Sequence, residues 1–216
     1  MLDGVEVTVS AEAVVVTAAR PLTVVSSAVA GGGFCHARSI VNVHVPKDFP
    51  WEDADVTLGA FARGRDLPAP WVGLLTAAWT EKAEIVSERA GGVAAIVVAT
   101  VGLGNLIAAG ASPVAAVTPS TINTIVVVDA DPEPAALVNL VMTVTEIKTM
   151  ALAAASVRCA DGAATGTSTD AVVVAATGRG ERCRFGGPIS TLGSVVARAA
   201  HRALTSGVER WLQEHR

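Results

Sequence analysis

The stretch from Thr121 to Thr177 constrains the fold more than any other part of this sequence. It contains Ile125–Val128, a β-branched run that is typical of a strand buried on both faces. From Ala135 to Ala155 there is no Gly or Pro, and Ala, Leu and Met dominate, which predicts a long helix. A TGTST loop follows, and Ala171–Ala176 predicts a second apolar strand. The stretch therefore reads as strand, helix, loop and strand.

The predicted helix carries a polar stripe among its apolar residues. Pro132 marks its start, because proline suits a first helical turn. Asn139, Thr143 and Glu146 are spaced at i, i+4 and i+7 and share one face, whereas Lys148 points away from Glu146. A carboxylate among alanines and valines is either solvated on an exposed helix face or held in a polar pocket. Both interpretations of Glu146 stay open at this point.

The loop after the helix gathers hydroxyl groups directly before a buried strand. Its hydroxyl and backbone N–H groups are suited to hold an amide or an oxyanion. The alternative is a capped turn whose side chains bond to their own backbone. The residues concerned are Thr165, Gly166, Thr167, Ser168, Thr169 and Asp170.

The composition argues against nucleic-acid binding and against a membrane span. The chain of 216 residues has a net charge of −4 without a basic patch, and only 4% of its residues are aromatic. No charged residue lies between Arg89 and Asp129, but Gly, Pro and Asn interrupt this run repeatedly. Its apolar part, Val93–Val101, is shorter than the roughly 20 residues that a spanning helix needs, so it predicts a buried strand.

The cysteines and histidines predict neither a disulfide nor a metal site. Cys35, Cys159 and Cys183 are far apart and form no CxxC pair, so they read as reduced thiols of a cytoplasmic protein. The N-terminal sequence MLDGVEVTVS also lacks the basic start and apolar core of a signal peptide. His36 and His44 lie about 26 Å apart along an extended strand, too far to share one ion.

Two segments near the N-terminus have features of a ligand-binding surface. Gly31–Gly33, which includes Gly32 and Gly33, permits close approach of a ligand to the backbone, although it matches no nucleotide-binding loop. In the alternating segment His36–Val45, Asn42 shares a face with His44, and this face is expected to point toward water or a ligand.

The rest of the chain predicts an α+β fold in one domain, residues 1–216: a layered mixed sheet with packed helices and a long C-terminal helix. A faint similarity between VATVGLGN and TGTSTDAVVV raises a pseudo-duplicated arrangement as a further interpretation. Thr80–Ala90 is expected to be an edge strand or an irregular turn. The other expected strands are Val5–Val9, Ala13–Ala18, Leu22–Ser27 and His36–Val45, and the other helices are Phe49–Leu67 and Ile189–His215. Trp71–Ala78 is a short apolar segment that ends in a Thr/Ala turn, and Ala111–Ser120, with two prolines, predicts a loop.

Together the motifs resemble the adenosylcobinamide amidohydrolase family of corrinoid salvage. The chain departs from the pattern at Ile147, where Ala is expected, and at Ser120, where Gly is usual before the TIN turn. The resemblance runs from about Ser26 to Ala176 and rests on SSAVAGGG, SIVNVHVP, VGLLTAA, ATVGLGN, STINTIVVVD, AALVNLVMTVTEIKTMAL and ATGTSTDAVVVAA, in this order.

The resemblance implies hydrolysis of the amide that joins the aminopropanol arm to the corrin ring of adenosylcobinamide. The products would be adenosylcobyric acid and 1-aminopropan-2-ol, and certain adenosylated cobamides would also be substrates. No cofactor is expected, because the substrate itself carries the cobalt. The expected partner is this corrinoid, and a homo-oligomer is compatible with the sequence.

Amide hydrolysis needs a nucleophile or activated water, a proton for the leaving amine and stabilisation of an oxyanion. We expect Glu146 to be the general base or acid and Thr167 to be the nucleophile or to orient the water. Asn123 is expected to bind the oxyanion, and Asp170 to orient the hydroxyl cluster. The expected substrate-binding residues are Asn42, Thr76, Asn105, Thr124, Gly32, Gly33, Thr165, Gly166 and Thr169.

Two other functions fit the same residues. A corrinoid-binding protein without catalysis would keep the groove and hydrolyse nothing. A hydrolase of a different amide would use a threonine or an N-terminal nucleophile and mature by self-cleavage. The product mass and the mass of the intact chain distinguish these alternatives.

Overall fold

The computed structural model describes residues 2–115 and 120–215. Its helices are α1 (Ala54–Gly64), α2 (Pro134–Ala154) and α3 (Thr191–Glu214), with short 3-10 helices η1 (Trp51–Asp53) and η2 (Thr80–Lys82). Helices and strands mix without regular alternation around one large mixed sheet, so the predicted α+β class and the long C-terminal helix are confirmed. The pseudo-duplication stays a prediction.

The large sheet has the order β4-β3-β2-β13-β8-β6-β5, with β1 paired to β2. Its neighbours are antiparallel except for β3 with β4 and β13 with β8, which are parallel. The strands are β1 (Val5–Val9), β2 (Ala13–Ser26), β3 (Gly33–His44), β4 (Trp71–Thr76), β5 (Glu84–Ala90), β6 (Val93–Val101), β8 (Ile122–Asp129) and β13 (Ala171–Ala176).

Short strands pair outside this sheet and fasten the loops. The pairs are β7 (Leu106–Ile107) with β12 (Gly166–Thr167), β9 (Asp131–Pro132) with β14 (Arg182–Cys183), and β10 (Arg158–Cys159) with β11 (Gly162–Ala163). The pairing of β12 with β7 holds the loop of residues 165–170, the Gly/Thr loop, in place, because Gly166 lies opposite Ile107 and Thr167 opposite Leu106.

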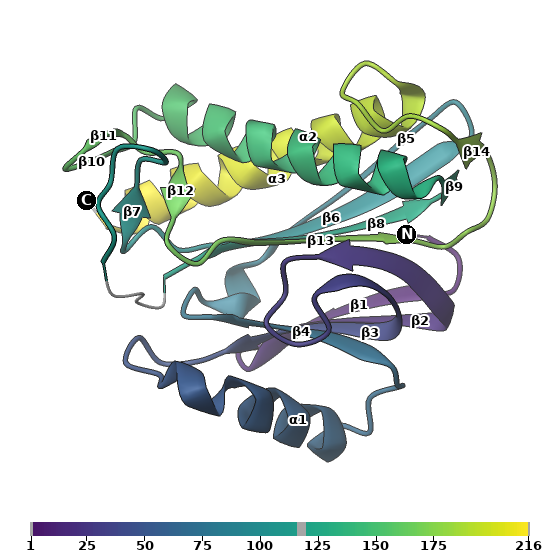
Figure 1. The fold of residues 1–216 in the computed structure, drawn as a ribbon, viewed down its shortest axis with the longest axis horizontal. Coiled ribbons are helices and arrows are strands. Elements are labelled where there is room, and N and C mark those ends of the chain that lie inside the picture. Colours follow the sequence, from purple (N-terminus) through teal and green to yellow (C-terminus); the bar gives the residue numbers. More distant parts are fainter. Residues whose placement is uncertain (1, 116–119, 216) are drawn as a thin grey trace.

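The fold is layered: two helices cover one part of the large sheet, the other part of the same sheet lies beneath it, and a third helix covers that part. Figure 1 shows α2 and α3 over the β5-β6-β8-β13 part of the sheet, and α1 beyond the β1–β4 part. Successive residues of a strand point to opposite faces. On β6, Val97 therefore belongs to the helix-facing cluster, whereas Ile96 and Val98 face the β1–β4 part. A third cluster packs Leu58 of α1 against β3 and β4.

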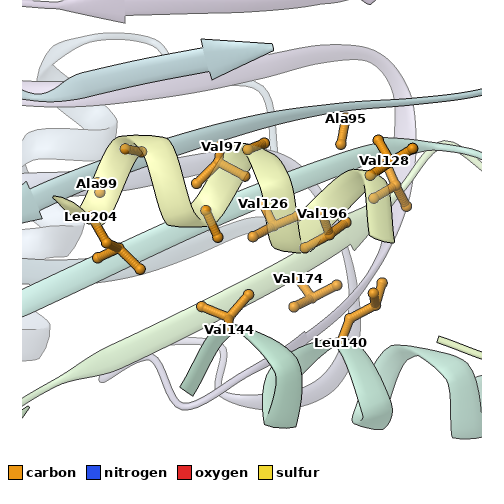
Figure 2. Close-up of a cluster of buried hydrophobic side chains, with 14 of the residues drawn as sticks. Ala95, Val97, Ala99, Val126, Val128, Leu140, Val144, Val174, Val196 and Leu204 are labelled. Atoms are coloured by element: carbon orange, nitrogen blue, oxygen red, sulfur yellow. The ribbon is translucent and has the colours of Figure 1, made fainter. Parts of the chain in front are cut away.

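The cluster between the sheet and the helices contains only aliphatic side chains among those drawn. Figure 2 shows Val126 and Val174 of the sheet facing Leu140 and Val144 of α2, with Leu204 of α3 nearby. α2 is also the described helix that is long and apolar enough to cross a membrane by length and composition. Here its buried side chains pack on the sheet and on α3, which is the environment of a core helix.

Several boundaries differ from the sequence-based expectations. The strand expected at Leu22–Ser27 is the second half of β2, which ends at Ser26, rather than a separate strand, and the register shifts between Thr17 and Leu22. Pro132 lies in β9, opposite Cys183, and α2 starts at Pro134. Thr80–Ala90 contains η2 and the edge strand β5. The loop expected at 111–120 lies partly outside the described residues.

Candidate active site

The candidate site lies at one edge of the molecule, where the ends of strands from the two parts of the sheet meet. The parallel strands β3 and β4 end here at His44 and Thr76, and the parallel strands β8 and β13 begin here at Ile122 and Ala171. A cavity of about 280 Å³ opens between them. Its lining residues are Ser27, Val29, Trp51, Leu74, Leu75, Asn123, Thr169, Asp170 and Ala171.

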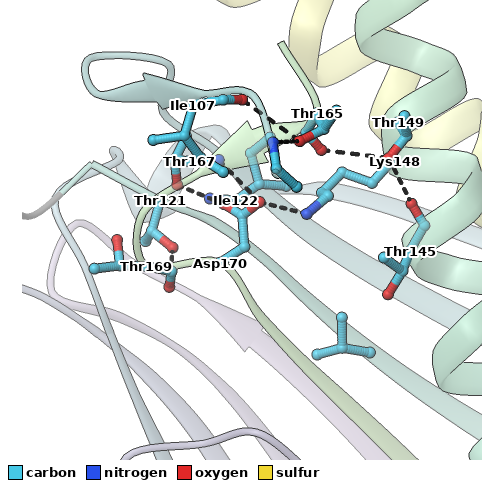
Figure 3. Close-up of polar contacts among 12 residues, drawn as sticks. Ile107, Thr121, Ile122, Thr145, Lys148, Thr149, Thr165, Thr167, Thr169 and Asp170 are labelled. Atoms are coloured by element: carbon cyan, nitrogen blue, oxygen red, sulfur yellow. Dashed lines mark hydrogen bonds and ion pairs between the residues drawn. The ribbon is translucent and has the colours of Figure 1, made fainter. Parts of the chain in front are cut away.

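The carboxylate of Asp170 is the centre of the hydrogen bonds around this edge (Figure 3). Its Oδ1 accepts the hydroxyl hydrogen of Thr167 at 2.5 Å and the backbone N–H of Ile122 at 3.0 Å. Its Oδ2 accepts the backbone N–H of Thr167 at 3.0 Å and a hydrogen of the Lys148 ammonium group at 2.5 Å. These four donors occupy the acceptor sites of the carboxylate and fix both of its oxygens.

Thr167 and Asp170 form a close hydrogen-bonded pair beside the cavity. Thr167 is only 5% exposed, and its hydroxyl points at a carboxylate that lines the cavity. A hydroxyl is a weak nucleophile until an adjacent base takes its proton, and the base in turn needs a group that orients it. Asp170 is placed to be the base, and Lys148 is placed to orient it.

The ion pair of Lys148 and Asp170 joins α2 to the loop before β13. Only 14% of the Lys148 side chain and 11% of the Asp170 side chain are exposed. Gly166 lies directly beneath the pair, because a Cβ on this residue would overlap Asp170 Oδ2 and lie 2.7 Å from Lys148 Nζ. The absence of a side chain at residue 166 therefore leaves the space that the pair occupies.

A buried row of side-chain amides and hydroxyls links the two parts of the sheet behind the cavity. Asn123 donates from Nδ2 to Leu75 O and to Asn42 Oδ1, both at 2.9 Å. Asn42 donates to Thr100 Oγ1 at 2.9 Å, and Thr121 donates to Asn123 Oδ1 at 3.0 Å. Because Leu75 O only accepts, it fixes which atom of the Asn123 amide is the nitrogen, and the orientation of Asn42 follows.

This arrangement changes what Asn123 is able to do. Both hydrogens of its amide nitrogen are used inside the protein, so they are not available for the oxyanion that we expected them to bind. Its Oδ1 accepts one hydrogen bond and has capacity for a second, which suits the N–H of a substrate amide. Asn42 is buried behind Asn123 at 1% exposure, so the expectation that it faces water or a ligand is wrong for this structure.

Trp51 of η1 supplies part of the opposite wall of the cavity. Its indole Nε1 is buried and has no hydrogen-bond partner within residues 2–115 and 120–215. A buried indole N–H normally finds an acceptor. Trp51 therefore holds a donor beside the cavity that no described residue satisfies.

Several expected substrate-binding hydroxyls are used by the protein itself. Thr76 Oγ1 accepts the N–H of Ala78 at 3.0 Å, and Thr165 Oγ1 accepts the N–H of Ala109 at 2.9 Å. Thr124 is buried and alternates with Asn123 along β8, so it turns to the helix-facing side. These contacts give the three threonines roles in the framework of the site.

The other expected binding residues are divided between the loop and the β2–β3 turn. Asn105 Nδ2 donates to Ser168 Oγ at 2.6 Å on the outer side of the Gly/Thr loop, and Thr169 lines the cavity. Gly32 and Gly33 lie exposed where β3 begins. Gly32 passes close to the chain, because a Cβ there would lie 2.6 Å from Ala28 O.

Glu146 is not brought together with Thr167. It lies on the exposed side of α2 and makes no side-chain hydrogen bond or ion pair with any described residue. The side of α2 that meets the loop instead carries Lys148 and Thr149, and Thr149 donates to Thr165 O at 3.3 Å. The sequence signal for this face was the spacing of Thr145, Lys148 and Thr149 at i, i+3 and i+4.

Acidic, histidine and cysteine side chains do not cluster around the cavity. Within the part of the chain that the structure describes, no group of three or more such residues is placed to hold a metal ion. The cavity lining itself carries one carboxylate, hydroxyl groups, one side-chain amide and an apolar wall.

A comparison with curated proteins finds no match to this sequence. Similar solved structures include a β-aminopeptidase from Burkholderia sp., at 13% identity over 93% of this chain and 79% of that chain, with a TM-score of 0.49. Another is a protein from Pyrococcus horikoshii OT3, at 14% identity over 97% of this chain and 80% of that chain, with a TM-score of 0.48. The adenosylcobinamide amidohydrolase family matches residues 1–216. The chain therefore belongs to the adenosylcobinamide amidohydrolase family, a family of hydrolases that act on an amide bond.

Proposed function

We propose that this protein hydrolyses the aminopropanol amide of adenosylcobinamide and releases adenosylcobyric acid and 1-aminopropan-2-ol. The family match over residues 1–216 supports the corrinoid substrate. The observation that carries the reaction is the 2.5 Å hydrogen bond from the Thr167 hydroxyl to Asp170 at the edge of the cavity. Asp170 lines the cavity, and Thr167, whose hydroxyl is held on this carboxylate, is the residue that we assign as the nucleophile.

The first half of the reaction forms an ester. Thr167 Oγ1 attacks the carbonyl carbon of the substrate amide, and its proton passes to Asp170 Oδ1 along the existing hydrogen bond. The C–N bond then breaks, and the proton moves from Asp170 to the departing nitrogen, which leaves as 1-aminopropan-2-ol. The acyl group of the corrinoid remains on Thr167.

The second half restores the enzyme. Water attacks the ester carbon, and Asp170 takes the proton of this water as it took that of Thr167. The ester bond breaks, Thr167 regains its proton, and the carboxyl group of adenosylcobyric acid is formed. One water is consumed for each amide bond that is broken.

The size of the cavity fits one arm of the substrate rather than the corrin ring. Its volume of about 280 Å³ lies just below the range of pockets that enclose a drug-sized ligand. We place the aminopropanol arm and its amide inside, with the ring at the mouth. Val29 supports this placement, because it lines the cavity and is 49% exposed, which offers apolar surface to the edge of the ring.

The test is incubation of the purified protein with adenosylcobinamide, followed by liquid chromatography and mass analysis. We expect adenosylcobyric acid and 1-aminopropan-2-ol in equal amounts. Tight binding of adenosylcobinamide without either product would support a corrinoid-binding protein and contradict the proposal. The mass of the intact chain is measured in parallel, because two fragments split before a Thr or Ser would indicate a self-cleaving hydrolase.

A further inference from the structure

The helix layer contributes one charge to the candidate site. The sequence of α2 contains two charged residues, Glu146 and Lys148, in an otherwise uncharged helix. Glu146 is exposed. The Lys148 side chain is only 14% exposed and reaches the loop before β13. Removing an ammonium group from water is costly, so its burial against Asp170 requires the partner's charge.

Gly166 is the second part of the same arrangement. Its φ lies outside the left-handed region, so its backbone conformation is open to residues with a side chain. What excludes a side chain is the ion pair, because a Cβ would overlap Asp170 Oδ2 and crowd Lys148 Nζ at 2.7 Å. The residue at position 166 and the ion pair above it are therefore mutually constrained.

We propose that Lys148 is a positioning residue for Asp170, and that Gly166 keeps open the space in which Lys148 holds it. This inference rests on the proposed function, in which Asp170 Oδ1 takes the proton of Thr167. Lys148 binds Oδ2, the oxygen that does not receive this hydroxyl, and sets, together with the backbone N–H groups of Thr167 and Ile122, the rotation that aims Oδ1 at Thr167. Lys148 acts through Asp170, because its ammonium group is held on Oδ2 of that carboxylate.

The same ion pair would also form if Lys148 only stabilised the fold and had no part in positioning Asp170. In both cases the loss of Lys148 lowers the thermal midpoint, so stability does not distinguish them. A positioning role predicts in addition that kcat falls while KM is retained, because the substrate still binds but the base is misplaced. A displacement of about 1 Å at a catalytic group is enough to reduce the rate on the order of 10²-fold.

The kinetic test compares Lys148→Met, Gly166→Ala and the double variant. We expect each single change to lower kcat by about 10²-fold with KM within about twofold. The double variant should lose about as much as one single variant, because both changes act on the same carboxylate. Lys82→Met is the matched control, since it removes a surface ion pair with Glu214 at 2.9 Å and should leave kcat unchanged.

Crystal structures of the variants provide a readout that does not depend on the substrate. We expect Asp170 Oδ1 to move beyond hydrogen-bond distance of Thr167 Oγ1 in Lys148→Met, and also in Gly166→Ala if that variant folds. If adenosylcobinamide is not hydrolysed by the unmodified protein but Asp170 moves, the proposed function fails and the positioning stands. If kcat is retained, or Asp170 stays in place in Lys148→Met, the positioning role is overturned whatever the substrate.

Discussion

Thr167 and Asp170 are three residues apart in the chain, and the hydroxyl of the first donates to the carboxylate of the second at 2.5 Å. The same carboxylate accepts the backbone N–H of Thr167, so the loop closes on itself around Asp170. The carboxylate also bonds to β8 through Ile122 and to α2 through Lys148. One acidic side chain thus joins the loop, the sheet and the helix layer beside the cavity.

Replacing Asp170 by Asn should abolish most of the activity. An amide of the same shape does not take the proton of Thr167, and loss of a general base typically costs 10²–10⁴-fold in rate. We expect a fall of kcat in that range, measured with adenosylcobinamide. Asp161→Asn is the control, because Asp161 accepts the hydroxyl of Ser112 at 2.5 Å on the surface. Equal activity in both variants would remove Asp170 from the mechanism.

Replacing Trp51 by Phe should weaken substrate binding and spare the chemical step. The ring remains in the cavity wall, while the indole N–H that has no partner among the described residues is lost. One net hydrogen bond is worth about 1 kcal/mol, so KM should rise about fivefold with kcat unchanged. Trp71→Phe, on the α1 side of the sheet, serves as the control. An unchanged KM in Trp51→Phe would show that the indole N–H does not contact substrate.

Replacing Glu146 by Gln separates the sequence-based expectation from the structural one. The helix motif predicts an acid or base at this position, but the side chain is exposed and makes no hydrogen bond or ion pair with a described residue. We therefore expect kcat to stay within the small range of ordinary surface substitutions, about twofold. A loss of about 10²-fold, the size of a general acid or base contribution, would return Glu146 to the mechanism.

Replacing Asn42 by Ala should destabilise the fold. The change leaves one N–H of Asn123 without its acceptor and Thr100 without its donor in a buried setting. A buried polar group that loses its partner costs about 1–3 kcal/mol in the free energy of unfolding, which chemical denaturation measures. Asn139→Ala, on the partly exposed side of α2, should change that free energy by less than about 0.5 kcal/mol. Equal values for the two variants would contradict the role given to the buried row.

Local sequence patterns predicted the elements whose conformation depends on their own residues rather than on contacts with distant parts of the chain. Val93–Val101 was predicted with its observed bounds because both of its faces are buried and apolar. The break expected before Leu22 is only a shift in register. Pro21 lacks an N–H and so interrupts the hydrogen-bond ladder locally, but the strand continues beyond it.

The site was predictable only where its parts are close in sequence. The hydroxyls and the carboxylate of the loop from Thr165 to Asp170 are adjacent in the sequence, and the Thr167 hydroxyl does bond to the Asp170 carboxylate. The bond between Asn42 and Asn123 joins strands from opposite layers of the fold, and no local pattern encodes it. Lys148 required knowledge of which face of α2 turns to the loop, and the apolar period of so uniform a helix leaves that rotation poorly defined.

The most direct measurement is the turnover of adenosylcobinamide by Thr167→Val and Thr167→Ser beside the unmodified protein. The valine keeps the shape and removes the hydroxyl, whereas the serine keeps the hydroxyl. The account predicts that valine lowers kcat by at least about 10³-fold and that serine retains measurable turnover, with the acyl group trapped on residue 167 after acid quenching. Turnover by Thr167→Val within about threefold of the unmodified protein would contradict the role of Thr167 as the nucleophile.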